Sequence, residues 1–206
     1  MAGILNSHIF ISAQNLFRKR CVTLFLDAYN SSILEGSISI SLDENDISAI
    51  LHNFIHKNLD RKKWQISSQI ENHLFNEKIT SYTKGFAAKQ SRIDFKFGVF
   101  WSGNEYDYFV EAKNLKSSDS HLKRRYIDTG MNNFLSGGKY QNCDGFLVGY
   151  ILEGNTKDCV DGINKLLEKD GRKTEFIFSS KLFSFDLFCS NHIDRDLNHI
   201  FLLYSN

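Results

Sequence analysis

The chain has 206 residues, of which 42% are hydrophobic and 24% charged, and its formal net charge is +1. This length and composition fit one globular domain with a buried core and exclude a disordered chain. The near-zero net charge excludes a strong global field that would select nucleic acid or a membrane, so any basic site must be local.

The chain starts with MAGILNSHIF, which lacks the basic n-region and long apolar stretch of a signal peptide. No segment is long and apolar enough to predict a membrane span. Residues 13–34 favour a helix, and GSISIS, residues 36–41, favours a short alternating strand. We interpret residues 1–40 as an N-terminal accessory segment packed on a core domain of residues 41–206.

A clearer helix is predicted over residues 41–59. Ser41 or Asp43 can cap it, acidic residues fill its first turn, and apolar residues then recur at helical spacing. KKWQISSQIENHLF, residues 62–75, predicts a strand. A polar connection over residues 76–90 then leads into a hairpin.

The hairpin is SRIDFKFGVFWSGNEYDYFVEAKNLK, residues 91–116. Gly103–Asn104 fit a two-residue turn, which predicts Asp94 opposite Lys113 and Lys96 opposite Glu111. Because side chains alternate along a strand, these charges share one face and the other face is apolar. A register slip of one residue would bury the charges, so the pattern demands this parity.

Two interpretations of the charged face remain open. It can be a solvated face with two cross-strand ion pairs, each worth about 0.2–1 kcal/mol. It can also be a functional site, because YFVEAK is more hydrophobic than an exposed strand requires. The cluster of Asp94, Glu111 and Lys113 is also followed at once by a loop and a helix, where sheets often present sites.

The rest of the chain alternates helices and strands. Residues 117–120, SSDS, offer helix caps, and residues 121–138 predict a helix that Gly137 and Gly138 end. Residues 143–152 predict a buried strand, residues 156–171 a helix, and residues 175–205 two or three closing strands. The predicted fold is therefore α/β, with a mixed sheet, helices packed on it and extra C-terminal strands.

The four cysteines, Cys21, Cys143, Cys159 and Cys189, lie too far apart in sequence for a CxxC pair. Neither a zinc knuckle nor a redox motif is therefore visible. We interpret them as reduced, mostly buried thiols, which predicts a cytoplasmic protein.

Asp94, sixteen intervening residues and then Glu111-Ala112-Lys113, on two successive strands after a helix, resemble the PD-(D/E)XK, or restriction-endonuclease-like, nuclease superfamily. RID and EAK are common local spellings of its motif, and Ile93 replaces the idealised proline. The predicted elements over residues 42–152 also resemble its α-β-β-β-α-β core. Residues 1–40 and the C-terminal third have no counterpart in this resemblance.

The resemblance implies a phosphodiester hydrolase that depends on Mg²⁺ or Mn²⁺. Phosphodiester hydrolysis needs a nucleophilic water and neutralisation of the charge that grows on phosphate. Asp94 and Glu111 are the predicted metal ligands, with the Ala112 backbone carbonyl as a third. Lys113 is predicted to orient and activate the water, so the candidate catalytic residues are Asp94, Glu111 and Lys113.

Other residues extend the candidate site. Glu71, in QIENHLF, is a further candidate metal ligand or simply a surface glutamate, and Glu44 competes for the same role. Lys123, Arg124 and Arg125 open the predicted helix of residues 121–138, where the macrodipole disfavours cations. They are therefore either contacts to a nucleic-acid backbone or a solvated basic turn.

Several other polar residues are given structural roles. Tyr126 is expected to pack on the inner face of its helix, and Gln141 has no assignable role. His52 and His56 lack the glutamate of HExxH, so a helix surface is favoured over zinc. SGGK, residues 136–139, is a helix stop rather than a phosphate loop, and His192 and His199 are also expected to be structural.

The predicted partner is nucleic acid, as double-stranded DNA, with a homodimer or a defence-system protein as further candidates and no membrane. The resemblance implies a role such as prokaryotic restriction or anti-phage defence. Two rivals remain: a catalytically silent fold that binds nucleic acid or protein, and an interaction protein whose charged face is only an ion-pair ladder.

Overall fold

The computed structural model describes residues 7–74, 91–101 and 103–205. The elements in chain order are α1 (Ser7–Leu34), α2 (Glu44–Lys57), α3 (Leu59–Lys63), β1 (Ser67–Leu74), β2 (Ser91–Trp101), β3 (Asn104–Lys116), α4 (Ser120–Arg125), the π-helical segment η2 (Tyr126–Met131), α5 (Asn132–Phe134), β4 (Gly145–Glu153), α6 (Thr156–Lys169), the 3-10 turn η3 (Lys173–Glu175), β5 (Phe178–Leu182), β6 (Phe185–Asn191) and β7 (Asp196–Leu203).

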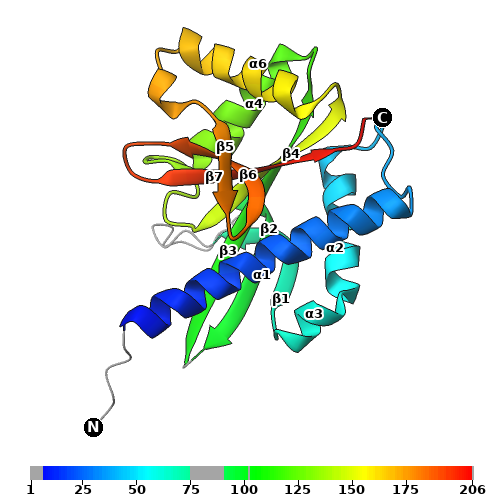
Figure 1. Cartoon of the computed structure of the whole chain (residues 1–206), viewed down its shortest axis with the longest axis vertical. Helices are drawn as coiled ribbons and strands as arrows, with labels where there is room; N and C mark the ends of the chain where they lie inside the picture. Colours follow the sequence, from blue (N-terminus) through cyan, green and yellow to red (C-terminus); the bar gives the residue numbers. More distant parts are fainter. Residues whose placement is uncertain (1–6, 75–90, 102, 206) are drawn as a thin grey trace, which may run out of the picture.

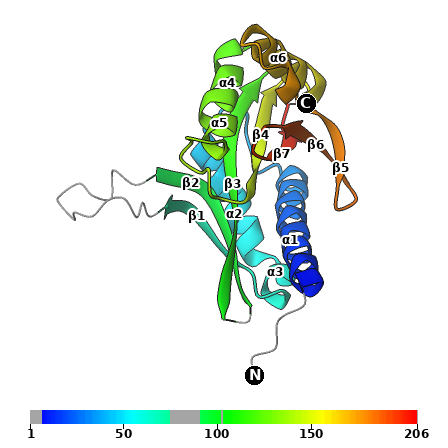
Figure 2. The same cartoon turned by 90° about the vertical axis from the view of Figure 1, so that its left-hand side faces the viewer.

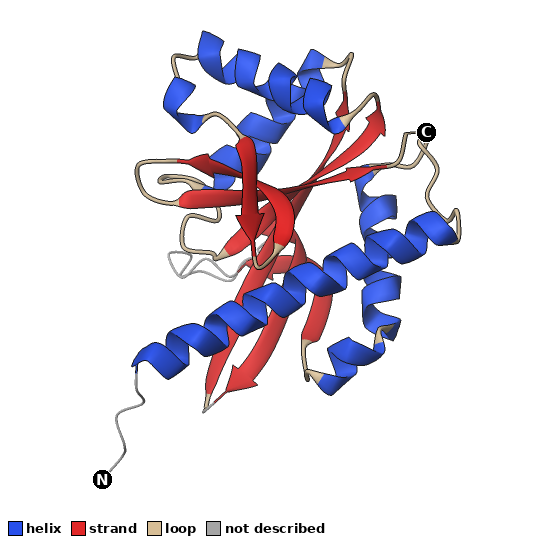
Figure 3. Ribbon diagram, viewed as in Figure 1, coloured by secondary structure: helices blue, strands red, loops and turns tan. Residues whose placement is uncertain are grey.

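The strands form one seven-stranded mixed sheet in the order β1-β2-β3-β4-β7-β6-β5. The pairs β3–β4 and β4–β7 are parallel, and the other neighbours are antiparallel. Figures 1 and 3 show helices flanking this sheet, and Figure 2 shows α1 and α4 on opposite sides of it. The predicted α/β class, with a mixed sheet flanked by helices and extra C-terminal strands, is confirmed.

α1 begins earlier than the predicted helix and ends where predicted, at Leu34. Its end is closed by backbone bonds from Gly36 N–H to Ile33 O and from Ser37 N–H to Ser32 O, both 3.1 Å, with Gly36 at φ 59°. These are the two bonds of a Schellman motif, in which glycine adopts the left-handed conformation without steric cost.

The strand predicted over residues 36–41 is wrong, because these residues form turns and a loop. The Ser39 hydroxyl accepts a hydrogen bond from Ser41 N–H at 3.3 Å and lies 2.9 Å from the Ser41 hydroxyl. Such local side-chain bonds offer the backbone an alternative to pairing in a sheet.

α1 shares one hydrophobic cluster with α2 and the sheet, which includes Phe25, Ile47 and Val148. The Phe25 ring meets Phe95 and Phe146 edge-on, at centroid distances of 5.1 and 5.6 Å. A boundary between an accessory segment and a domain near residue 40 stays a prediction, but the buried face of α1 belongs to this common core.

α2 confirms Asp43 as the N-cap residue. Asp46 N–H donates to Asp43 Oδ1 at 2.9 Å, and Asp43 N–H donates back to Asp46 Oδ2 at 3.4 Å, which is a reciprocal capping box. The strand predicted from residue 62 begins later, at Ser67, because Asn58 caps the short helix α3. The predicted connection of residues 76–90 lies outside the described residues.

The hairpin forms as predicted, but its turn lies one residue earlier. Trp101 pairs with Asn104, and Gly103 takes φ 80°. Lys96 therefore lies across from Phe109 and not Glu111, so that predicted ion pair is wrong. The pairing is offset by two residues, an even number, so Phe95, Phe97 and Val110 keep the predicted apolar face. Ile93, which the alternation also places on that face, is instead buried with Phe109 in a separate cluster.

The helix predicted over residues 121–138 is three consecutive segments, α4, η2 and α5. Its predicted inner stripe is buried at Tyr126, Ile127, Met131 and Phe134, together with side chains of β4 and α6 in a second cluster. This cluster covers the sheet face opposite α1. A core on each face therefore holds β3 and β4 at the centre of the molecule.

The remaining predictions on the chain are confirmed at the level of elements. The predicted helix of residues 156–171 is α6, and the predicted closing strands of residues 175–205 are β5, β6 and β7. All four cysteines are free thiols; Cys21 and Cys159 are buried and the other two are partly buried. Among the described residues, no helix is both long and apolar enough to cross a membrane.

Candidate active site

Asp94 sits where β2 and β3 begin to separate. The recorded pairing of the two strands ends at Phe95–Val110. Just beyond it, Asp94 Oδ2 accepts the backbone N–H of Ala112 at 2.6 Å. The side-chain carboxylate thus satisfies a backbone donor near the end of the ladder, which fixes the carboxylate beside β3.

Lys113 lies at the centre of three carboxylates. Its Nζ is 2.7 Å from Glu111 Oε1, 3.1 Å from Glu44 Oε1 and 3.9 Å from Asp94 Oδ2. Nζ also donates to the Ala112 carbonyl at 2.6 Å. The side chains of Lys113 and Glu111 are only 6% and 7% exposed. The structure therefore brings the three predicted catalytic residues together in one buried cluster.

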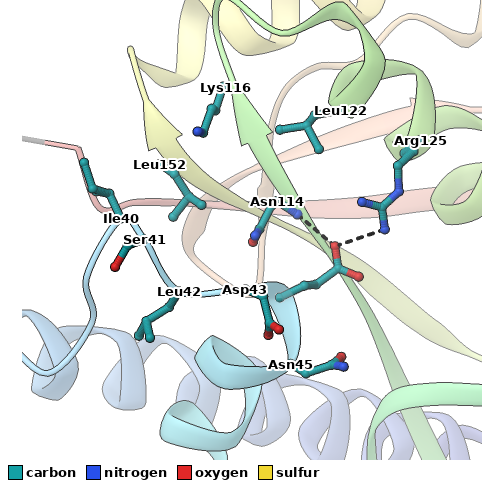
Figure 4. Close-up of a pocket in the computed structure, with 11 residues that line it drawn as sticks. Ile40, Ser41, Leu42, Asp43, Asn45, Asn114, Lys116, Leu122, Arg125 and Leu152 are labelled. Carbon is teal, nitrogen blue, oxygen red and sulfur yellow. Dashed lines mark hydrogen bonds and ion pairs between the residues drawn. The ribbon is translucent and has the colours of Figure 1, made fainter.

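Glu44 is a full member of this cluster, because it contacts Lys113 directly although the two residues are far apart in the sequence. Its second oxygen, Oε2, accepts the backbone N–H of Asn114 at 3.0 Å and lies 3.8 Å from Arg125 Nη2. Figure 4 marks these two interactions with dashed lines. Glu44 is the first residue of α2, so it ties the start of that helix to β3.

Glu71 lies at the rim. It stands on β1 between the pairs Ile70–Phe95 and Asn72–Ile93, which places it across from Asp94. Its side chain is 55% exposed and lies 3.9 Å from Arg92 Nη1. Its φ of 50° is unusual for a residue with a side chain. A part for Glu71 in metal binding stays a prediction.

A cavity of about 370 Å³ opens over the cluster. It is lined by residues from the α2 start, β1, β2, β3 and the α4-to-α5 region, together with the loop that follows α5. The lining residues are Asn45, Glu71, Ser91, Arg92, Ile93, Asp94, Glu111, Lys113, Arg125, Thr129, Asn133, Lys139 and Tyr140. Tyr140 closes one side, because its hydroxyl donates to the Arg92 carbonyl.

The electrostatics of the cluster follow from burial. Burial raises the pKa of Glu111 to about 8, and the charge of Lys113 only partly opposes this. Burial also raises the pKa of Asp94, against the opposing effects of Lys113 and the Ala112 N–H. Burial alone would lower the pKa of Lys113, but Glu111, Asp94 and Glu44 together raise it, so the ammonium form is kept.

The donor set fits a hard divalent cation. Glu111 Oε2 is buried and has no hydrogen-bond partner among the described residues, so it keeps lone pairs to offer. No group of three His, Cys, Asp or Glu side chains is arranged to hold a metal in the described part of the chain. Mg²⁺, however, is usually held by one or two carboxylates, with water and substrate phosphate completing its shell. Asp94 and Glu111 suit that arrangement.

The three basic residues Lys123, Arg124 and Arg125 have different surroundings. Asp119 caps α4 at His121 and Leu122, and the backbone stays helical through η2, so Lys123, Arg124 and Arg125 lie near the start of the helical run, as predicted. Lys123 is buried and donates to Ser117 O at 2.7 Å. Arg124 pairs with Asp170. Of the three, Arg125 lines the cavity.

The histidines near the C-terminus form a buried chain of hydrogen bonds. His199 joins the Tyr126 hydroxyl and the Ser190 hydroxyl, each at 2.8 Å. His192 bridges the Ser190 hydroxyl at 2.8 Å and Glu175 Oε2 at 2.6 Å. Burial lowers the pKa of His199 to about 3. This chain ties η2 to β6 and β7, in keeping with the structural roles expected for Tyr126, His192 and His199.

Sequence reasoning missed several residues that line the cavity, among them Asn45, Thr129, Asn133 and Tyr140. Lys139 was considered only as part of a helix stop. The one usable signal was Asn45, which directly follows Glu44 at a predicted helix start. Thr129 and Asn133 lie in or directly after the π-helical segment, and Lys139 and Tyr140 lie in the loop after α5; no residue pattern indicated that these parts reach the site.

Comparisons with protein-family models, with curated proteins and with solved structures find no match for this chain. Its function is therefore inferred from the residues and the geometry of the cluster around Lys113.

Proposed function

We propose that this protein is a metal-dependent nuclease of the PD-(D/E)XK, restriction-endonuclease-like type, which hydrolyses phosphodiester bonds in DNA. One observation carries the proposal. Asp94 on β2 and Glu111 on the neighbouring strand β3 both direct carboxylates toward the buried ammonium of Lys113. The element order supports it: apart from the short helix α3 and the segments η2 and α5 that continue α4, the order is α2-β1-β2-β3-α4-β4, and the resemblance implies an α-β-β-β-α-β core.

The proposed chemistry assigns each group a task. A bound Mg²⁺ or Mn²⁺ would neutralise phosphate charge and lower the pKa of a water that it holds. Asp94 and Glu111 would hold the ion, and the Ala112 carbonyl is a candidate third ligand. Lys113 keeps positive charge beside both carboxylates, which favours their ionised forms, and Nζ can donate a proton or hydrogen bond.

Cationic side chains at the cavity rim would position the DNA backbone. Arg125, Arg92 and Lys139 all line the cavity. Phosphate contacts of this kind fix register and orientation without reading sequence. We therefore assign backbone binding to this rim and leave out Lys123 and Arg124, which do not line the cavity.

A second candidate function is a catalytically silent module that binds nucleic acid or a partner protein. Two observations favour it. The Ala112 carbonyl already accepts a hydrogen bond from Lys113 Nζ, and among the described residues no three-residue metal cluster is present. In this case Lys113 itself would permanently neutralise the carboxylates, and no divalent ion would bind.

Calorimetric titration with Mn²⁺ separates the two candidates. The nuclease proposal predicts binding heat for the parent protein and its loss in Asp94→Asn. Asp107→Asn is the matched control, because Asp107 is also on the hairpin but pairs with Lys96 at 2.9 Å. No heat for the parent, together with no DNA cleavage in Mg²⁺ or Mn²⁺, would refute the nuclease proposal; DNA binding alone would then favour the silent module.

A further inference from the structure

The carboxylates of the site are recessed. The side chains of Glu111, Asp94 and Glu44 are 7%, 19% and 17% exposed. A cavity of about 370 Å³ covers them, which is near the lower end of the range of small-molecule pockets. A scissile phosphate must therefore enter a confined space, whereas the phosphates of a duplex lie on the outside of a wide rod.

A second cavity, of about 630 Å³, lies beside the first. Asn45 and Arg125 line both cavities, so the two meet at these side chains. In Figure 4 Lys116, Leu122 and Arg125 lie along one side of this second cavity, and Leu42, Asp43 and Asn45 lie along the other. A larger hollow with a mixed lining thus lies next to the recessed cluster.

The lining of the second cavity suits one nucleotide better than a stretch of duplex. Leu42 and Leu122, both partly buried, offer apolar surface to a base or sugar, and Lys116 offers a cation to a phosphate. Asn114 lines this cavity, and its Oδ1 is buried without a hydrogen-bond partner in the described part of the chain. A small rotation of this side chain would let Oδ1 accept a hydrogen bond from the Watson–Crick edge of a base. Bases expose their faces and their Watson–Crick edges only when they are unstacked and unpaired.

We infer that this site takes an unpaired DNA strand, such as single-stranded DNA, an overhang or a flap. The nucleotide next to the scissile phosphate lies in the second cavity, with its phosphate at Lys116 and its base against the leucines. This inference rests on the proposed function for the position of the scissile phosphate. It narrows the substrate from DNA in general to an unpaired strand.

The test measures binding in EDTA, where no cleavage occurs. A fluorescein-labelled oligonucleotide is titrated with protein, first single-stranded and then annealed to its complement, at several salt concentrations. The variants are Lys116→Ala and the matched control Lys157→Ala, whose lysine is exposed on α6 and pairs with Asp161 at 3.3 Å. Thermal melts check that both variants stay folded.

The single strand should bind at least about tenfold more tightly than the duplex, a difference of about 1.4 kcal/mol. Lys116→Ala should weaken single-strand binding several-fold and reduce the slope of log affinity against log salt by about 0.7, the loss of one phosphate contact. Lys157→Ala should change neither. Equal or tighter binding of the duplex, or a Lys116→Ala variant that behaves like Lys157→Ala, would overturn the inference.

Cleavage assays in Mn²⁺ keep the two claims separate. If no DNA is cut but the single-strand preference and the Lys116 effect persist, the strand inference stands and the nuclease proposal fails. If duplex is cut as fast as single strands, the nuclease proposal stands and the strand inference fails.

Discussion

Lys113 is a buried cation, and its contribution to the stability of the fold depends on the carboxylates around it. Its ammonium contacts carboxylates from α2, β2 and β3. Removing one partner from a buried ionic group is costly, because the remaining charges are left without compensation. This differs from an exposed ladder of ion pairs, in which each pair contributes at most about 1 kcal/mol.

Lys113→Met should therefore destabilise the metal-free protein by about 3–5 kcal/mol. Lys96→Met is the control, because Lys96 pairs with Glu105 and Asp107 on the same hairpin but is more exposed. Urea unfolding in EDTA measures both. Mn²⁺ should restore more stability to Lys113→Met than to the parent, since a divalent ion can replace the lost charge. Equal, small losses in both variants would indicate an ordinary ion-pair ladder.

Glu111 should make stability depend on pH. Its pKa in the folded protein, about 8, lies above the ordinary value of 4.5. Between these values the folded state binds more protons than the unfolded state, so the free energy of unfolding falls as pH rises. Asp94, whose pKa is also raised, adds a decline of the same sign.

Glu111→Gln should remove most of this decline between about pH 5 and about pH 8, and Glu105→Gln, at an exposed site on the same strand, should leave it intact. Unfolding titrations in EDTA across this pH range provide the measurement. Parallel profiles for the parent and Glu111→Gln would show that Glu111 titrates as it does in the unfolded chain.

At the scale of single residues, the sequence predicted which side chains of the hairpin share a face of the sheet, because side chains alternate along a strand. Asp94, Glu111 and Lys113 had to share a face because apolar residues alternate with them, and an offset of two residues left that conclusion unchanged. The contact between Glu44 and Lys113 spans 69 positions, so no local pattern contains it. The burial of Lys123 likewise depends on the approach of Gly162 from α6.

At the scale of elements, α1 packs on the core through its buried face, as an accessory segment packed on the core would. Phe25 is fully buried against the sheet, and deletion of a buried Phe side chain typically costs about 3–5 kcal/mol. Phe25→Ala should show a loss of this size by urea unfolding. Leu34→Ala, on the same helix but 87% exposed, should stay within about 0.5 kcal/mol of the parent.

A chain that begins at Ser41 tests the same helix as a unit. Without α1, much of one sheet face loses its cover, so we expect broad, non-cooperative melting and exposed apolar surface that binds a hydrophobic dye. Sharp, two-state melting of the shortened chain would show that residues 1–40 are dispensable for the fold.

Elements differed in how well the sequence predicted them. α2 and α6 have capping residues and a regular apolar stripe, so their positions followed from the pattern. GSISIS alternates like a strand, but it lies directly after a helix stop and bonds to itself. The π-helical segment changes the helical phase after Arg125 and thereby sets which side chains line the cavity, and no local pattern marks such a change.

At the scale of the whole molecule, the described residues of each chain form one candidate site, so one chain should cut one strand at a time. Supercoiled plasmid exposes unpaired strand only transiently, so it should be cut more slowly than single-stranded DNA, and nicked circles should accumulate well before linear DNA. Gel electrophoresis over a time course measures this order. Linear DNA that appears without a nicked intermediate would instead require two sites acting together, as in the homodimer that the sequence left open.

The most direct test of the central claim is cleavage of circular single-stranded DNA by the parent protein and by Asp94→Asn, in Mn²⁺ and in EDTA. We predict that the parent cuts in Mn²⁺ and not in EDTA, because Asp94 and Glu111 hold the ion, and that Asp94→Asn loses most of this activity while remaining folded. If Asp94→Asn cuts as fast as the parent, or if neither protein cuts single-stranded or plasmid DNA with Mg²⁺ or Mn²⁺, the cluster around Lys113 is not a nuclease site.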